Sequence, residues 1–344
     1  MLTRSFVANF VRTLRLFAPA LAVICLLSSS TVAQKSGFKS FIVGNAADTP
    51  PSPNLTPGLV LMGGGTDVDE AFQWMCQRAG GGDFLVIRTS GTDAYNPYIQ
   101  ELCPQMDSVE TIIIGNVNGA NATYVSNQIR NAEALWIAGG DQSTYVELWR
   151  GTAVQSGVNF LLNTKLAPVG GTSAGLAVLS QFIYTGARGS ITSSQALADP
   201  FHRYMTLDRD LFQSTLGVGK LYDSHFVTRD RMGRSLTFLA RIVANGWAAQ
   251  PRGIGLDEET ALLVAANGSA TMVGAGDAYF LQAPGPAQVV ADDTPLTYLN
   301  IGVYKLPQGG TFNFSTWTGT GGVAYTLNVN NGLVTSTQAG GEIY

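Results

Sequence analysis

Charge and histidine are both scarce in this sequence. Only 13% of its 344 residues are charged, and it contains just two histidines, His202 and His225. No run of lysine or arginine forms the basic surface that phosphate binding needs, so nucleic acid is excluded as a partner. Two histidines do not make a recognisable ligand spacing, so we expect no metal and no cofactor.

Long hydrophobic runs are absent too. The apolar stretch Leu16 to Leu27 is shorter than the roughly 20 residues that a spanning helix needs. Three arginines precede it and a small-residue cleavage site ends at Ala33, which predicts a signal peptide over residues 1–33. A retained membrane anchor is the alternative. Cleavage would give a secreted protein, extracellular or periplasmic and free of the membrane, and its formal charge would fall from −4 to −7.

Cysteine is rare, with three in the chain. Cys25 would leave with the signal peptide, so Cys76 and Cys103 remain as an even pair in a chain bound for an oxidising compartment. A disulfide between them is the prediction, and two buried free thiols are the alternative.

Apolar residues make up 45% of the sequence, enough for a sizeable core. Four prolines between Asp48 and Pro57 predict an irregular N-terminal arm over residues 34–57. An α/β domain should follow over residues 58–275 and a β-rich C-terminal extension over residues 276–344. Periodicity leaves open whether that extension joins the main sheet, and a homodimer is compatible with the sequence.

Short apolar runs alternate with helical patterns in the α/β region. Helices are expected over Asp67 to Arg78 and Ser143 to Trp149. This alternation predicts a mostly parallel sheet with helices on both faces. The expected strands are Leu59 to Met62, Phe84 to Ile87, Val109 to Ile114, Leu135 to Ala138 and Leu166 to Val169. Glycine-rich turns follow three strand ends, at Gly63 to Gly65, Gly139-Gly140 and Gly170-Gly171, and predict a site there.

One of these turns opens a possible nucleophile motif. Gly171-Thr-Ser173-Ala-Gly175 follows an apolar strand and begins a helical stretch that we expect to reach Phe182. A sharp strand-to-helix turn of this kind exposes a serine as a nucleophile, although a helix N-cap serine after glycines has the same pattern. The N–H groups of Ala174 and of the turn at Gly140 are the expected oxyanion donors.

A serine nucleophile needs a base, and only two histidines can supply it. His225 lies where a strand end meets a charged turn, whereas His202 lies in a stretch typical of a surface turn. His225 is therefore the preferred base, and a structural histidine is the alternative.

Three arginines follow His225 within a few residues: Arg229, Arg231 and Arg234. The guanidinium fork binds carboxylates in a bidentate manner, so this cluster predicts a pocket for an acidic group. The competing interpretation is a solvated surface turn.

Four sequence blocks together resemble the cyanophycinase-like branch of the family that also includes aspartyl dipeptidase. They occur in the family's order across about two thirds of the chain. The blocks are Gly140-Asp-Gln142; Gly171-Thr-Ser173-Ala-Gly175; Asp223-Ser-His225-Phe with Arg229, Arg231 and Arg234; and Gly253-Ile-Gly-Leu-Asp257-Glu-Glu-Thr260.

The resemblance implies a flavodoxin-like or class I glutamine amidotransferase-like fold and a serine exopeptidase that cleaves bonds made through aspartate. Cyanophycinases release β-aspartyl-arginine dipeptides from cyanophycin, a polyaspartate backbone with arginine side groups. By this resemblance a peptide is the partner, Ser173 is the nucleophile and His225 is the base. The implied substrate-binding residues are Gln142, Asp223, Arg229, Arg231 and Arg234.

The third member of the triad is the weakest part of the match. The family places an acidic residue soon after the serine, but this chain has none between Ser173 and Asp199. Asp199 is therefore the expected acid, with Asp223 or a neutral acceptor as alternatives. The family's usual glutamine before the histidine is Ser224 here. An α-aspartyl dipeptidase, or a catalytically silent binding protein, is the competing hypothesis.

Overall fold

The computed structural model describes residues 37–48 and 54–344, and these described residues belong to one compact unit. The signal peptide expected over residues 1–33 lies outside the described residues. Within the described ranges, no helix has both the length and the apolar character needed to cross a membrane.

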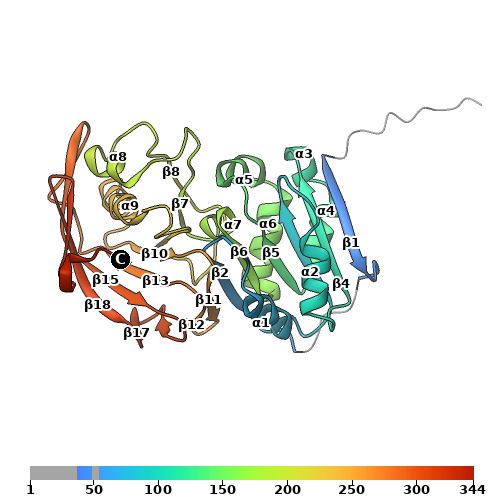
Figure 1. Cartoon of the computed structure of the whole chain (residues 1–344). Helices are drawn as coiled ribbons and strands as arrows, with labels where there is room; N and C mark the ends of the chain where they lie inside the picture. Colours follow the sequence, from blue (N-terminus) through green and yellow to red (C-terminus); the bar gives the residue numbers. More distant parts are fainter. Residues whose placement is uncertain (1–36, 49–53) are drawn as a thin grey trace, which may run out of the picture. The chain divides into compact units, whose positions relative to one another are not determined.

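The first sheet has ten strands, of which the central five are parallel to one another (Figure 1). In spatial order the strands are β1 (Phe38–Gly44), β4 (Ser108–Ile114), β3 (Asp83–Arg88), β5 (Ala134–Ile137), β6 (Val169–Thr172), β2 (Gly58–Met62), β11 (Thr260–Ala265), β12 (Ser269–Gly274), β16 (Thr311–Asn313) and β17 (Thr318–Thr320).

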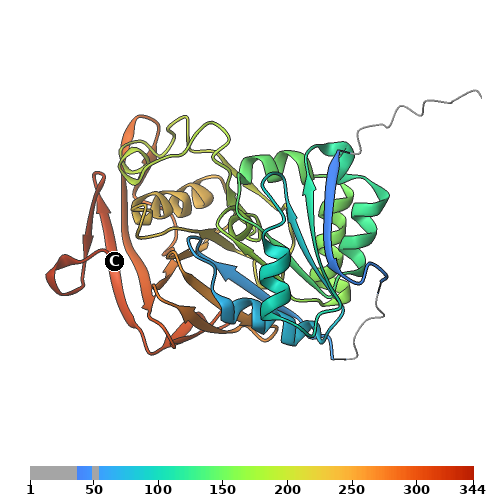
Figure 2. The same cartoon turned by 45° about the vertical axis from the view of Figure 1, so that its right-hand side comes forward.

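Both faces of the parallel part are buried, which explains its continuous apolar runs. Alternate residues of β2 enter two different cores, Leu59 and Leu61 on one face and Val60 and Met62 on the other. The second face is covered by α1 (Asp69–Ala79) and α2 (Tyr95–Leu102), and the first is covered partly by α4 (Thr123–Asn131) and α6 (Ala153–Phe160) (Figures 1 and 2).

The helices connect and cover these strands. They are α1 (Asp69–Ala79), α2 (Tyr95–Leu102), α3 (Val117–Ala120), α4 (Thr123–Asn131), α5 (Gln142–Trp149), α6 (Ala153–Phe160), a π-helical turn (Leu161–Lys165), α7 (Ala174–Val178), α8 (Ser193–Ala198), α9 (Met232–Ala244) and a 3₁₀ turn (Ala339–Gly341).

The second sheet has nine strands, mostly antiparallel. In order they are β19 (Leu333–Ser336), β18 (Val323–Asn330), β15 (Thr294–Leu306), β13 (Ala278–Gln282), β10 (Arg252–Leu256), β9 (Lys220–Asp223), β7 (Phe182–Tyr184) and β8 (Leu207–Arg209), while β14 (Val289–Ala291) pairs with β15. One pairing matters for the site: β9 and β10 are parallel neighbours, with Asp223 opposite Gly255.

The prediction of a mostly parallel sheet is wrong, because both sheets are mixed. Only the segment from β4 to β2 has the expected parallel arrangement with helices on both faces. After residue 253 most strands are joined by tight turns, and such turns return the chain antiparallel to the previous strand. The α/β class itself is confirmed.

The C-terminal strands do not stand apart from the rest. In the second sheet β13 pairs with β10, and β15 and β18 continue outward from it. In the first sheet β16 and β17 extend the edge beyond β12. The region over residues 276–344 therefore contributes to both sheets.

Two local expectations need correction. The arm over residues 34–57 was expected to be irregular, but Phe38–Gly44 forms β1, which pairs antiparallel with β4. The strand expected at Leu166 to Val169 begins at Val169 instead, because Leu166 adopts a left-handed conformation (φ 59°) that ends the π-helical turn. Gly170 and Gly171 thus lie inside β6.

Cys76 of α1 and Cys103 at the end of α2 form a disulfide, as expected. Both residues are fully buried. The bond joins the two helices that cover one face of the first sheet.

Candidate active site

Ser173 lies at a sharp turn between β6 and α7. Its backbone has φ 53° and ψ −113°, a strained conformation for a residue with a side chain. A hydrogen bond from the Ser173 N–H to the Met62 carbonyl (3.1 Å) helps to hold the turn. The predicted nucleophile elbow is therefore present, although α7 ends at Val178 rather than near Phe182.

The two glycines that flank Ser173 let strand and helix approach closely. A Cβ on Gly171 would lie 2.6 Å from the carbonyl carbon of Gly175. A Cβ on Gly175 would lie 2.0 Å from the Ile137 carbonyl oxygen. Any larger residue would push α7 away from the sheet and move the serine, so these glycines are needed for the turn.

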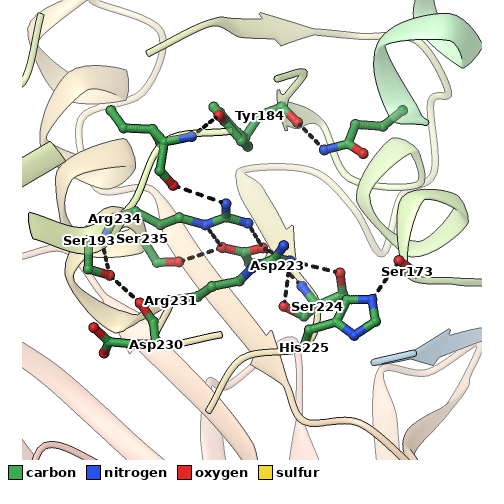
Figure 3. A network of polar contacts seen from close by, with 12 residues as sticks. Ser173, Tyr184, Ser193, Asp223, Ser224, His225, Asp230, Arg231, Arg234 and Ser235 are labelled. Atoms are coloured by element: carbon green, nitrogen blue, oxygen red, sulfur yellow. Dashed lines mark hydrogen bonds and ion pairs between the residues drawn. The ribbon is translucent and has the colours of Figure 1, made fainter. Parts of the chain in front are cut away.

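His225 faces the serine. Its Nε2 lies 2.8 Å from Ser173 Oγ (Figure 3). His225 follows β9 with φ 46°, and its N–H donates to the Gly63 carbonyl (2.8 Å). Gly64 packs against the ring, since a Cβ there would lie 2.4 Å from His225 Cε1. The other histidine, His202, instead packs edge-on against Tyr204.

The acid beside His225 is Glu258, which corrects the expectation of Asp199. His225 Nδ1 and Glu258 Oε1 are 2.5 Å apart, so Ser173, His225 and Glu258 form a continuous hydrogen-bonded chain. Glu258 lies in the turn between β10 and β11. Its side chain is 32% exposed, so water reaches part of the carboxylate.

Asp199 is occupied elsewhere. It ends α8, where its carboxylate accepts hydrogen bonds from the N–H groups of Phe201 (2.8 Å) and Asp293 (3.3 Å). Loop 185–192, the region where the resemblance implies an acid, contains none. The acid beside the histidine lies instead in the turn after β10, the strand next to β9.

The surroundings of His225 favour a neutral imidazole. Burial lowers its pKa below the ordinary value of 6.5, and the positive charges of Arg229 and Arg231 lower it further. The hydrogen bond from Nδ1–H to Glu258 acts in the opposite direction. A ring that is neutral near pH 7, with its Nδ1 proton held by Glu258, leaves Nε2 free to accept the proton of Ser173.

Two backbone groups could serve an oxyanion. Ala174 is the first residue of α7, so its N–H has no partner within the helix. The single Tyr145 O–H lies within hydrogen-bond distance of the carbonyls of Ala138 (2.9 Å) and Gly139 (3.1 Å) and is shared between them, which fixes the turn that carries Gly140. In a trans peptide the N–H of Gly140 points opposite to the Gly139 carbonyl. That N–H therefore points away from the Tyr145 hydroxyl, and it is the second candidate donor to an oxyanion.

A small hollow of about 70 Å³ lies beside Ser173. We call it the arginine hollow and define it by Gly140, Gln142, Ser173, Arg229 and Arg231, which line it with Tyr184, Tyr222 and Ser224. Its volume is that of about two water molecules, enough for one carboxylate-sized group. Gln142 Nε2 donates to the Tyr184 carbonyl (3.3 Å) at its wall.

Two of the three predicted arginines line this hollow. Arg229 is exposed, and its side chain makes no hydrogen bond or ion pair within residues 37–48 and 54–344, while its backbone N–H donates to the His225 carbonyl (3.1 Å). Arg231 is mostly buried and donates to the Ser224 carbonyl (2.7 Å) and to Asp223 (3.2 Å). Burial lowers the pKa of Arg231 to about 10, so its side chain stays charged at neutral pH.

Arg234 does not line the hollow, contrary to expectation. It is 3% exposed, and its Nε and Nη2 donate to the two carboxylate oxygens of Asp223 (2.8 and 2.5 Å; Figure 3). Although burial alone raises the pKa of Asp223, Arg234 and Arg231 hold it below its usual value. Asp223 and Arg234 therefore form a fixed ion pair, and Arg229 and Arg231 are the arginines that line the hollow.

Comparisons with known proteins find similarity to cyanophycinases and to a solved peptidase structure. No family model matches the chain. It is 24% identical over 280 residues to cyanophycinases of Synechococcus elongatus and Thermosynechococcus vestitus, covering 75% of this chain and 80% of each relative. The structure of a peptidase from an acI-B1 actinobacterium superposes with a TM-score of 0.50 at 15% identity, covering 76% of this chain and 98% of that one, which supports the fold.

The chain is thus cyanophycinase-like. Glu258, which contacts His225, was not among the site residues predicted from the sequence. It stands in the fourth block of the resemblance, Gly253 to Thr260, and an acidic triplet there follows a buried strand. Because β9 and β10 are parallel neighbours, the residues just beyond their carboxyl ends lie together. The sequence therefore contained the acidic triplet after a buried strand, but only the order of the strands shows that this triplet lies beside His225.

Proposed function

We propose that this chain is a serine-type exopeptidase that hydrolyses cyanophycin or related β-aspartyl peptides. The observation that carries the proposal is the hydrogen-bonded chain of Ser173, His225 and Glu258 at a nucleophile elbow. The likeness to cyanophycinases supports the substrate class.

In the proposed mechanism, Ser173 Oγ attacks the carbonyl carbon of the scissile bond while His225 Nε2 takes its proton. The N–H groups of Ala174 and Gly140 stabilise the negative charge on the carbonyl oxygen. His225 then protonates the leaving amine, and an acyl-enzyme forms on Ser173. Water, activated by the same histidine, hydrolyses this ester and restores the serine. Glu258 keeps the Nδ1 proton in place and stabilises the imidazolium.

The arginine hollow supports recognition of an aspartyl group. Arg229 and Arg231 place positive charge beside Ser173, and the small volume suits a single carboxylate. In cyanophycin the bond to be cut is the α-peptide bond of the polyaspartate backbone, and the nearby free carboxylate is the α-carboxylate of the attached arginine. In an α-aspartyl dipeptide that carboxylate is the aspartate side chain. The arginine hollow therefore also supports an α-aspartyl dipeptidase as a second candidate.

A silent binding protein is less well supported than either enzyme. That hypothesis was motivated by the missing triad acid, and Glu258 lies where an acid is needed. Secretion remains part of the proposal. It is supported by the signal-like residues 1–33 and by the disulfide between Cys76 and Cys103, a bond typical of exported proteins.

The test is hydrolysis of insoluble cyanophycin by the protein starting near Gln34, with released peptides identified by mass. Ser173→Ala and His225→Ala should abolish release, and Ser156→Ala, which removes a surface hydroxyl outside the site, should not. Cleavage of an α-aspartyl dipeptide without release of β-aspartyl-arginine from cyanophycin would identify the second candidate, and the reverse result would identify the first. A fluorophosphonate probe should label the parent and not Ser173→Ala. A folded parent that cleaves no substrate and takes no probe would reject the proposal.

A further inference from the structure

A second, larger hollow opens at the carboxyl ends of β2 and β3. Its volume is about 390 Å³, within the range of small-molecule sites. We call it the acidic hollow and define it by Thr66, Asp67, Asp69, Arg88, Tyr95 and Tyr98. It shares no lining residue with the arginine hollow.

The acidic hollow begins close to the reacting groups. Gly64 packs against the ring of His225, and Asp67 is three residues further along the same loop. Three residues span at most about 11 Å, so the loop cannot carry Asp67 far from the histidine. Thr66 Oγ1 also donates to Glu259 (3.1 Å), the residue after Glu258. A peptide bound at Ser173 can therefore reach this hollow with a neighbouring residue.

The charges in the hollow favour a cation. Asp67 and Asp69 line the hollow together with one guanidinium, that of Arg88, which donates to the Thr92 carbonyl (3.0 Å). Burial raises the pKa of Asp67, and hydrogen bonding by Tyr95 and the charge of Arg88 only partly oppose this. A second cation beside Asp67 would stabilise the ionised carboxylate, so binding and ionisation would reinforce each other.

Aromatic side chains complete the hollow. Tyr98 donates its hydroxyl to Asp69 Oδ1 (2.6 Å), which orients that carboxylate. The rings of Tyr95 and Tyr98 lie 6.4 Å apart at 55°, so they present π faces in different directions. A planar guanidinium suits such walls, because it can stack on a ring while its N–H groups bind carboxylates.

We propose that the acidic hollow is a subsite for a basic side chain of the peptide substrate, with Asp67 and Asp69 binding a guanidinium and Tyr95 and Tyr98 forming its walls. This rests on the proposed function for the assignment of a peptide substrate. The two hollows then bind substrate groups of opposite charge: a carboxylate binds at Arg229 and Arg231, and a cation binds at Asp67 and Asp69.

Binding can be tested without turnover in the Ser173→Ala protein. L-Arginine amide and L-citrulline amide have nearly the same shape and the same α-amino group, but only the first has a charged side chain. Ligand-observed NMR titration gives both dissociation constants. We expect arginine amide to bind at least about tenfold more tightly, the effect of one charge-assisted contact. The Asp67→Asn/Asp69→Asn variant should lose this preference. Glu70→Gln, which removes an exposed charge beside Asp69 that does not line the hollow, should keep it.

Equal binding of the two amides, no binding of arginine amide, or a preference that survives in Asp67→Asn/Asp69→Asn would overturn the subsite. Asp69→Asn alone, at an exposed position, repeats the test if the double variant does not fold. Catalysis gives a separate readout: the double variant should raise KM for an arginine-bearing substrate about tenfold or more and leave kcat near the parental value. Absence of hydrolysis by the parent would reject the proposed function, whereas the NMR titration would still decide on the subsite.

Discussion

At the scale of single residues, the strain at Ser173 is the clearest sign of function. A serine with φ 53° and ψ −113° persists because Gly171 and Gly175 allow β6 and α7 to approach closely. The backbone of His225 is also left-handed, at φ 46°. Two strained residues whose side chains are hydrogen-bonded to each other are typical of a catalytic site.

Glu258→Gln tests the proposed triad. The amide keeps the size of the side chain but can hold the wrong tautomer of His225, so kcat should fall on the order of 10⁴-fold. Asp199→Asn should stay within a few-fold of the parent, because Asp199 contacts Phe201 and Asp293 rather than the histidine. Steady-state kinetics on the cleaved substrate measures both. The assignment fails if the two variants are equally active.

The pH dependence follows from the lowered pKa of His225. The reaction needs the neutral imidazole, so kcat/KM should rise with pH, with its midpoint below 6.5, and be fully developed at neutral pH. Arg229→Ala removes a positive charge that lowers this pKa, so the midpoint should move to higher pH. A pH–rate profile of each protein measures the shift, and a downward shift in Arg229→Ala would contradict the electrostatic account.

At the scale of elements, the loop from His225 to Arg231 is fixed by hydrogen bonds to Tyr344, the last residue of the sequence. Tyr344 accepts a hydrogen bond from the Met232 N–H (2.9 Å) and donates one to Asp230 (2.8 Å). Its ring packs edge-on against Phe226 and Tyr279. This clamp fixes the start of α9, and with it the direction of the two arginines in the arginine hollow.

Tyr344→Phe removes both hydrogen bonds and keeps the ring. We expect a several-fold increase in KM with little change in kcat, because the arginines bind substrate and do not take part in the proton transfer, and a loss of about 1–2 kcal/mol in the free energy of unfolding. Tyr298→Phe is the matched control, since it removes a buried hydroxyl bonded to the Gly285 carbonyl (2.8 Å). Equal KM values in the two variants would show that the clamp does not position the arginines.

At the scale of the whole molecule, the two mixed sheets bring the site together from distant parts of the chain. Ser173 follows a strand of the first sheet, His225 follows a strand of the second, and Glu258 lies in the turn that joins β10 of the second to β11 of the first. The C-terminal strands stabilise the second sheet by pairing with β10 through β13. Loss of these strands would therefore disturb the acid and the base together.

The disulfide gives a prediction on global stability. Cys76 and Cys103 are 27 residues apart, and closing a loop of this length in the unfolded chain is worth about 3.5 kcal/mol in the chain-entropy model. Cys76→Ala/Cys103→Ala should lower the free energy of unfolding by roughly that amount, measured by denaturant titration. Reductant should destabilise the parent and leave the variant unchanged. A parent that is indifferent to reductant would argue against the contribution.

The parallel strands of the first sheet could be predicted from the sequence because the patterns that indicate them lie within short segments. Continuous apolar runs mark the buried parallel strands, and four of the five expected strands agree with the structure within one residue at each end. The nucleophile elbow was also accessible, since glycine, serine and the following helix lie in one short segment. The second sheet was not, because its strand order depends on pairings between segments far apart in sequence.

The sequence by itself was enough to predict Ser173 as nucleophile and His225 as base, because the chain has one such serine motif and only two histidines. Tertiary structure decided the third group. Asp199 is nearer to Ser173 in sequence, but Glu258 reaches His225 because β9 and β10 are parallel and adjacent. It also decided the roles of the arginines, turning Arg234 inward to Asp223 and leaving Arg229 exposed. Sequence motifs predict which side chains could react. The pairing of strands determines which charged side chains lie next to them.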